Sequence, residues 1–248
     1  YFKKISMSGH SKWAQIKHQK GAADSKRGRL FGKLARNISV AAREGKDLET
    51  NFKLRLATDK AKAINMPHDT IERAILRGAG ELAGQQQLTE VIYEAYGPAG
   101  SAFMIIANTD NKNRTASQIR HILSKQNGNI AETGSVGWNF EIRGVIKIEN
   151  LKLKVKSLEN FELQMIDLGA VDIKSTDQDI IVYTFLTDLQ KIKDAITKIG
   201  LEIESADIEY APKNKLELAR EDNGKVLQLI SALEEEEEVA NVFSNVSI

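Results

Sequence analysis

Lysines and arginines near the N-terminal end of this chain have the types and spacing that a binding site requires. Between positions 12 and 36 they recur every few residues, and Asp24 is the one acidic residue among them. A Lys or Arg that meets a phosphate displaces a condensed counterion, so a run of unpaired cations suits contacts with a nucleic-acid backbone. The candidate residues are Lys12, Lys17, Lys20, Lys26, Arg27, Arg29, Lys33 and Arg36.

Charge is divided unevenly along the chain. Residues 1–80 hold 18 Lys and Arg against 7 Asp and Glu, whereas the other 168 residues hold 17 against 27. The net charge of +1 conceals this division. A concentrated positive end beside an acidic remainder predicts a polyphosphate partner, which means nucleic acid first of all.

Two further candidate residues have two interpretations each. Trp13 lies in the basic arm, where its ring could stack on a base or anchor the arm on the protein. Arg114 lies in the polar stretch 109–115, between a predicted strand and a predicted helix. That stretch favours a helix cap at Asn113 or Asp110, and its second interpretation is a polar cluster for phosphate or RNA edges. Both Trp13 and Arg114 join the candidate nucleic-acid surface.

Five consecutive glutamates, residues 234–238, follow the last predicted helix. The simplest interpretation of this run is a solvated helix end. Its functional alternative is a phosphate mimic that screens the basic N-terminal part of the chain.

Catalytic and metal-binding patterns are not found in the sequence. The chain has no cysteine, which excludes disulfides, thiolate metal ligands and cysteine nucleophiles. Residues 28–33 resemble a phosphate-binding loop, but the motif is one residue short and lies within a predicted helix. The histidines lack metal-ligand spacing. We therefore expect no enzyme, no catalytic residue, no metal, no cofactor and no small-molecule substrate. The histidines are His10, His18, His68 and His121.

The same sequence offers no membrane or export signal. No apolar run approaches the roughly 18–20 residues of a membrane span. A signal-peptide pattern is also missing. We expect a cytoplasmic protein without a membrane partner.

Apolar periodicity predicts a small basic helical domain over residues 7–80. The first predicted helix has Asp24 as its N-cap, apolar residues on one side, and a basic stripe ending at Arg43 on the other. Arg43 therefore joins the candidate surface. The predicted segments are an arm at 8–23, helices at 24–43, 51–64 and 67–78, and a linker at 80–87.

The following residues change to the alternation of strands. The C-terminal tail has no core of its own, so we expect it to return and complete the sheet that starts after the linker. This predicts a discontinuous α+β domain over residues 88–141 and 212–248. Its predicted strands are 91–96, 102–108, 136–140, 215–219 and 239–246, and its predicted helices are 115–126 and 224–233.

Between these two segments the pattern is β-α-β-β-α-β, which is typical of a ferredoxin-like unit. We assign it to an inserted domain over residues 142–211. The predicted fold is thus α+β with three domains, a helical bundle and two α+β domains, one of them inserted into the other. The predicted segments of the insert are 145–148, 158–168, 171–174, 180–185, 189–199 and 202–208.

Short motifs along the chain, taken together, carry a family resemblance. They are MSGHSKW at 7–13, KR at 26–27, FGKL at 31–34, AAREG at 41–45, NMP at 65–67, YEAYGP at 93–98, TDNKNRT at 109–115, GSV at 134–136 and VANV at 239–242. From Met7 to the C-terminal end the chain resembles the YebC/PmpR family.

The resemblance implies a fold and two roles. It implies three domains, a helical bundle and two α+β domains with the last inserted into the middle one, and no catalytic motif. Members are described as cytoplasmic transcriptional regulators that bind DNA. Others, including mitochondrial translational activators of cytochrome c oxidase subunit I, are described as translation factors that act at the ribosome.

We therefore carry three functional hypotheses. The first is a DNA-binding transcriptional regulator, although no helix-turn-helix pattern is evident. The second is a translation factor that binds ribosomal or transfer RNA, which suits a basic arm containing Trp13. The third is a protein-interaction module without direct nucleic-acid contact. The charge pattern by itself favours nucleic acid without separating DNA from RNA.

Overall fold

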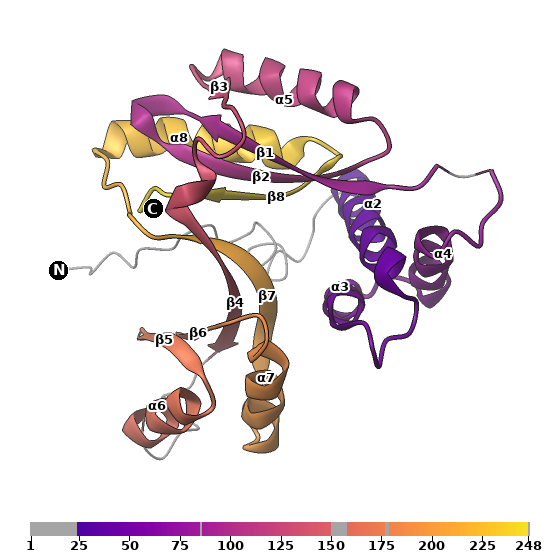
Figure 1. The fold of residues 1–248 in the computed structure, drawn as a ribbon, viewed down its shortest axis with the longest axis vertical. Coiled ribbons are helices and arrows are strands. Elements are labelled where there is room, and N and C mark those ends of the chain that lie inside the picture. Colours follow the sequence, from indigo (N-terminus) through magenta and orange to yellow (C-terminus); the bar gives the residue numbers. More distant parts are fainter. Residues whose placement is uncertain (1–23, 85, 150–157, 177–178, 248) are drawn as a thin grey trace. The chain divides into compact units, whose positions relative to one another are not determined.

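The computed structural model describes residues 24–84, 86–149, 158–176 and 179–247 (Figure 1). Two compact units are present: residues 141–211 form one, and the described residues before and after that segment form the other. The elements are helices and two antiparallel four-stranded sheets, which confirms the predicted α+β class.

The larger unit begins with helices whose apolar faces meet, as the sequence predicts. Leu34 and Ile38 of the first helix pack with Leu54 of the second and Ile71 of the third. Asn51 caps the second helix, because its side chain accepts a hydrogen bond from the N–H of Leu54. The elements are α2 (Asp24–Ala41), the 3-10 turn η1 (Ala42–Glu44), α3 (Phe52–Ala63) and α4 (His68–Gly78).

A glycine allows α4 to approach α2 closely. A Cβ atom added to Gly78 would lie 2.1 Å from the carbonyl oxygen of Ser39, far inside van der Waals contact. The hydroxyl of Ser39 donates a hydrogen bond to the carbonyl of Ala74 at 2.8 Å, which holds the same pair of helices. The position of α2 is thus fixed by direct packing on α4.

The first sheet follows, in the order β3-β1-β2-β8. Its last strand comes from the end of the chain and pairs with β2, which confirms that the C-terminal tail completes this sheet. The strands are β1 (Thr89–Tyr96), β2 (Ala102–Thr109), β3 (Asn129–Ile130) and β8 (Val239–Ser244).

Helices α5 (Lys112–Lys125) and α8 (Arg220–Glu235) share one core with this sheet. Phe103 and Ile105 of β2 pack there with Ile119 of α5 and Leu229 of α8. The alternate residues of β2 point to the opposite face, because successive side chains of a strand alternate. On that face Asn108 donates a hydrogen bond to Asn37 of α2 at 2.7 Å. The sheet therefore lies between α2 on one face and the α5–α8 pair on the other.

The strand predicted at 136–140 is wrong. Residues Gly137–Asn139 form a 3-10 turn (η3), and the strand begins at Phe140. The backbone N–H groups of Gly134, Val136 and Gly137 donate to the carboxylate of Glu94. Because a backbone N–H that bonds a carboxylate is not available to a sheet ladder, this segment cannot pair as a strand.

Two smaller predictions also fail. The strand expected at 215–219 is a single bridge, from Leu216 to Val246. The cap of α5 is neither Asn113 nor Asp110. It is Asn111, whose side chain accepts a hydrogen bond from the N–H of Arg114. The three polar residues have similar cap propensity, so the sequence did not distinguish them.

The second unit has the element order β-α-β-β-α-β and the strand order β5-β6-β4-β7, which confirms the ferredoxin-like prediction. Ile146 and Ile148 of β4 lie opposite Val182 and Ile180 of β6, and all four are buried. The elements are β4 (Phe140–Glu149), α6 (Leu158–Asp167), β5 (Ala170–Ser175), β6 (Asp179–Thr184), α7 (Leu189–Lys198) and β7 (Ile203–Pro212).

Candidate nucleic-acid interface

The first turns of α2 carry exposed cations. Arg27 and Arg29 are both exposed, and neither pairs with a carboxylate among the described residues. The guanidinium of Arg27 lies 5.3 Å from the centroid of the Phe31 ring, a cation–π distance. Lys26 lies in the same helix. The remaining arm candidates lie outside the described residues: Lys12, Trp13, Lys17 and Lys20.

These cations lie at the unfavourable end of the helix. The macrodipole places partial positive charge at a helix N-terminus, where Lys and Arg are destabilising. Arg27 and Arg29 fall within the first two turns of α2. A bound anion would relieve this repulsion and accept hydrogen bonds from both guanidinium groups.

The second half of α2 is held by the segment that joins α8 to β8. The ammonium of Lys33 donates to the carbonyl of Glu234 at 2.5 Å and to that of Val239 at 2.8 Å. The guanidinium of Arg36 forms an ion pair with Glu237 at 2.6 Å. Lys33 and Arg36 therefore anchor α2 to the sheet.

Arg114 is also engaged within the protein. Its guanidinium pairs with Asp110 at 2.7 Å and with Glu238. Hydrogen bonds to Glu238 and then to Asp110 raise the pKa of Arg114, and the hydrogen bond from Arg114 lowers the pKa of Asp110. Thr115 adds a hydroxyl hydrogen bond of 2.5 Å to the second oxygen of Glu238.

The glutamate run is more than a solvated helix end. Glu238 is 5% exposed, and its carboxylate binds the side chains of Arg114 and Thr115. Glu237 is exposed and pairs with Arg36. The run therefore neutralises two of the candidate cations, and its backbone binds a third, Lys33.

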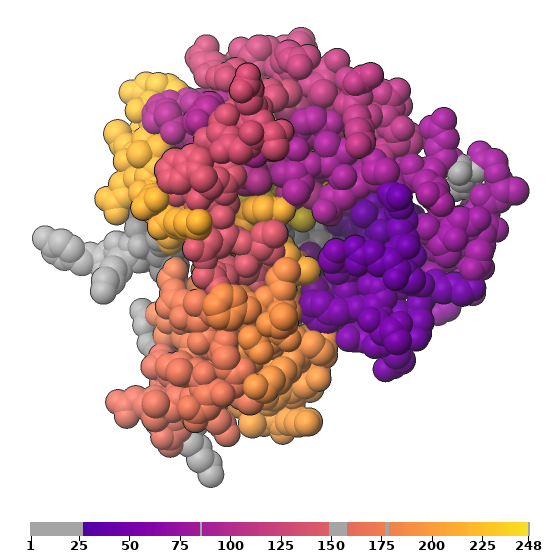
Figure 2. All heavy atoms as spheres, viewed as in Figure 1, coloured from indigo at the N-terminus to yellow at the C-terminus, as the bar shows by residue number. Residues whose placement is uncertain are grey.

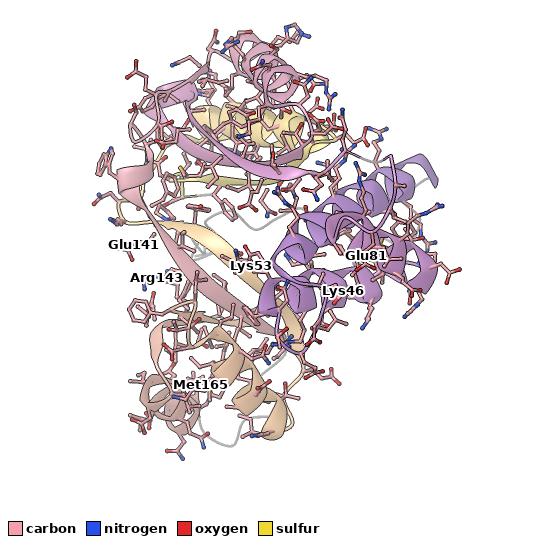
Figure 3. The ribbon with its side chains drawn as sticks, turned by 45° about the vertical axis from the view of Figure 1, so that its right-hand side comes forward. Lys46, Lys53, Glu81, Glu141, Arg143 and Met165 are labelled. Carbon is pink, nitrogen blue, oxygen red and sulfur yellow. The ribbon has the colours of Figure 1, made fainter. Side chains whose placement is uncertain are left out.

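Other cations of the helical part are paired as well. Lys46 pairs with Glu81 at 2.5 Å (Figure 3). Lys53 pairs with Glu44 at 2.7 Å. Arg43 is exposed and donates to the carbonyl of Leu88 at 2.8 Å. In Figure 2 this helical part forms the indigo-to-purple region of the surface. Unpaired positive charge is present at the start of α2, and also at the exposed Lys62 of α3 and Arg73 of α4, which have no carboxylate partner among the described residues.

Sequence reasoning missed a second basic surface, on α5. Lys112, Arg120, His121 and Lys125 are exposed, and no carboxylate pairs with them in the described part of the chain. The sequence does indicate this surface, because residues 111–131 contain no Asp or Glu.

Metal ligands do not gather in the described residues: no group of three or more His, Cys, Asp or Glu is close enough to hold an ion. His68 and His121 are exposed, and His10 and His18 lie outside the described residues. Residues 28–33 lie inside α2, as predicted, and not in a phosphate loop. No helix in the described ranges is long and apolar enough to span a membrane.

Comparison with known proteins identifies relatives that match this chain over nearly its full length. The chain is 50% identical over 243 residues to a "Probable transcriptional regulatory protein" of Fervidobacterium nodosum, covering 98% of this chain and 94% of the relative. It is 48% identical over 245 residues to a protein of the same description from Thermoanaerobacter pseudethanolicus, covering 98% of each chain.

A solved structure and two family descriptions agree with these relatives. The crystal structure of a conserved hypothetical protein from Aquifex aeolicus matches with a TM-score of 0.82 and 43% identity, covering 95% of this chain and 96% of that one. Residues 11–81 match the TACO1/YebC protein N-terminal domain, and residues 88–246 match the TACO1/YebC second and third domain. The chain therefore belongs to the TACO1/YebC family, which confirms the resemblance carried by its motifs.

Proposed function

We propose that the protein is a nucleic-acid-binding regulator of gene expression that acts in the cytoplasm. Its binding domain is residues 7–80, followed by the discontinuous domain and the inserted one. The observation that carries the proposal is the exposed pair Arg27 and Arg29, which has no carboxylate partner among the described residues. Together with Lys26 and the basic arm, this end of α2 is suited to a phosphate backbone.

The first target class is duplex DNA, and the protein would then be a transcriptional regulator of the YebC type. The support comes from the full-length relatives described as probable transcriptional regulatory proteins. In this proposal the backbone contacts set the affinity and the register on the duplex. Lys33, Arg36, Arg43 and Arg114 position the interface through their contacts within the protein.

A second target class, ribosomal or transfer RNA, is favoured by the way α2 is held. A recognition helix needs a run of side chains that can enter a groove. The second half of α2 is instead committed to the sheet through Lys33 and Arg36. Contacts made by one helix end and an arm suit the exposed loops of structured RNA. The protein would then be a translation factor.

The binding surface is tested by removing unpaired and paired cations in parallel. Each phosphate contact contributes about 0.7–0.9 to the slope of log affinity against log salt concentration. We expect R27A/R29A to reduce that slope by about 1.5 and to weaken binding to all sequences alike. K46A/K53A removes the same charge from ion-paired positions and should leave the slope nearly unchanged. Equal slopes for the parent protein and R27A/R29A would refute the proposal.

The target class is tested by crosslinking in growing cells, purification under denaturing conditions, and sequencing of the attached nucleic acid. Reads concentrated on promoter DNA would establish the transcriptional regulator. Reads concentrated on ribosomal or transfer RNA would establish the translation factor. If no nucleic acid is attached and a protein partner is retained after nuclease treatment, a protein-interaction module replaces both.

A further inference from the structure

A turn beside the first sheet is held by a buried carboxylate. Glu94 of β1 is 8% exposed, and its two oxygens accept the backbone N–H groups of Gly134, Val136 and Gly137 at 2.6, 2.6 and 2.7 Å. Burial alone would raise the pKa of Glu94, but the three donors together lower it, so the carboxylate is ionised at neutral pH. Three charge-assisted hydrogen bonds fix the backbone of this turn.

The turn presents two aromatic side chains to solvent. The indole N–H of Trp138 and the hydroxyl of Tyr96 both donate to the carbonyl oxygen of Ser135, each at 3.0 Å. Trp138 is 64% exposed and Tyr96 is 40% exposed. Because both ring edges converge on one oxygen, the rings are neighbours with fixed orientations. Large apolar rings held rigidly in water mark a surface that a ligand covers.

Two residues next to the rings have polar side chains. Asn129 lies directly opposite Tyr96 in the β1–β3 register, so the two side chains share a face, and its amide is exposed. The backbone N–H of Lys213 donates to the carbonyl of Asn139, the residue after Trp138, at 2.7 Å. Lys213 is exposed and has no carboxylate partner among the described residues.

We propose that Tyr96, Asn129, Trp138 and Lys213 bind one unpaired nucleotide, with its base stacked on the aromatic rings. The amide of Asn129 can meet the edge of the base, and Lys213 can meet its phosphate. An amide and a cation on residues next to the rings complement the base edge and the phosphate of a nucleotide. This inference rests on the proposed nucleic-acid binding, to which it adds a site for unpaired bases.

The site lies away from the point where Asn37 of α2 meets the sheet. Asn108, which bonds α2, pairs with Glu90 at the far end of β1 from Tyr96. Tyr96 is six positions along β1 from Glu90, which is a distance of about 20 Å. A strand bound at both places would have to extend over several nucleotides, so the two contacts can be altered separately.

The test uses the emission of Trp138. The chain has two tryptophans, so the W13F variant leaves Trp138 as the one reporter. It is titrated with single-stranded 12-mers of RNA and of DNA, and with an abasic 12-mer that has the same phosphates. Base stacking predicts quenching by one or both oligonucleotides with bases and little quenching by the abasic one. Quenching by RNA alone, DNA alone or both identifies the source of the unpaired base. Equal quenching by the abasic chain overturns the proposal.

Affinity gives the second readout. Loss of a base-stacking side chain weakens single-strand binding about 5- to 150-fold. We expect W138L to weaken binding within that range and leave the salt slope unchanged, with W138F intermediate and circular dichroism unchanged for both. If W138L binds as the parent does while R27A/R29A is weakened, the stacking site is refuted and the proposed function stands. If both bind as the parent does, the proposed function fails too.

Discussion

Two buried glutamates lie near different ends of the first sheet, and the protein satisfies them in different ways. Glu238 binds side chains, the guanidinium of Arg114 and the hydroxyl of Thr115. Glu94 binds only backbone, the three N–H groups of the turn at 134–137. The first arrangement pairs a cation that would otherwise face solvent. The second pairs no cation and instead makes a loop rigid.

This difference separates the two candidate surfaces. Around Glu238 and its neighbours, groups of the protein itself bind the cations Lys33, Arg36 and Arg114. Around Glu94 the turn is fixed while aromatic rings remain exposed. A buried carboxylate can therefore either withdraw a side chain from binding or present one for it, according to whether its donors are side chains or backbone.

The largest effect should come from Glu94→Ala. The three backbone donors would lose a charged acceptor, and we expect the free energy of unfolding to fall by about 3 kcal/mol. Urea denaturation followed by circular dichroism measures it. Glu132→Ala removes an exposed glutamate that precedes the same turn and should change stability by less than about 0.5 kcal/mol. Similar losses for the two variants would contradict the role assigned to Glu94.

The dependence on pH gives the next effect. The pKa of Glu94 is below its ordinary value, so the folded state favours the ionised carboxylate. Its contribution to stability is complete above about pH 5 and is lost as pH falls through the lowered pKa. The melting temperatures of the parent and Glu94→Gln should differ at pH 7 and converge as the pH falls below the lowered pKa of Glu94. If the difference in melting temperature is the same at every pH, the charge of Glu94 is not the cause of the stability loss.

Much of the fold follows from local sequence, and the failed strand at 136–140 shows where a local pattern is insufficient. The apolar spacing of Leu34 and Ile38 predicts α2, and the βαββαβ order predicts the second unit. The failed strand at 136–140 depends on Glu94, which lies about forty residues away along the chain. The alternation of apolar and polar residues within one segment carries no information about a hydrogen bond to a residue so far along the chain. The sequence pattern therefore could not predict that a carboxylate accepts these backbone N–H groups.

The candidate site was predictable to a similar degree. Counting charges located the basic end of the chain, including Arg27 and Arg29. It did not show that Arg114 is paired with Glu238, which is 124 residues away in the sequence. The exposed aromatic pair was missed because Tyr96 and Trp138 are 42 positions apart in the sequence and both donate to the carbonyl of Ser135 in the folded chain.

A smaller effect is expected at the other buried carboxylate. Glu238→Gln keeps the shape but weakens the hydrogen bonds to Arg114 and Thr115, and we expect a stability loss of about 1 kcal/mol. Arg114 would keep Asp110 as a partner but lose one of its two carboxylates, so binding to nucleic acid should tighten modestly and the salt slope should steepen by less than about 0.8. Glu235→Gln, an exposed neighbour with the same charge change, is the control. Weaker binding by Glu238→Gln than by Glu235→Gln would argue against release of Arg114.

The smallest effect should come from Arg36→Ala, which decides whether that cation is an anchor or a ligand contact. The side chain of Glu237 is 58% exposed, and an ion pair with such a partner contributes about 0.5 kcal/mol, less at high salt. We expect this small stability loss and an unchanged salt slope, because the guanidinium already has a carboxylate. A slope reduced by about 0.8 would show that nucleic acid displaces Glu237. The glutamate run would then act as a phosphate mimic that competes for α2, and the basic surface would extend over both halves of the helix.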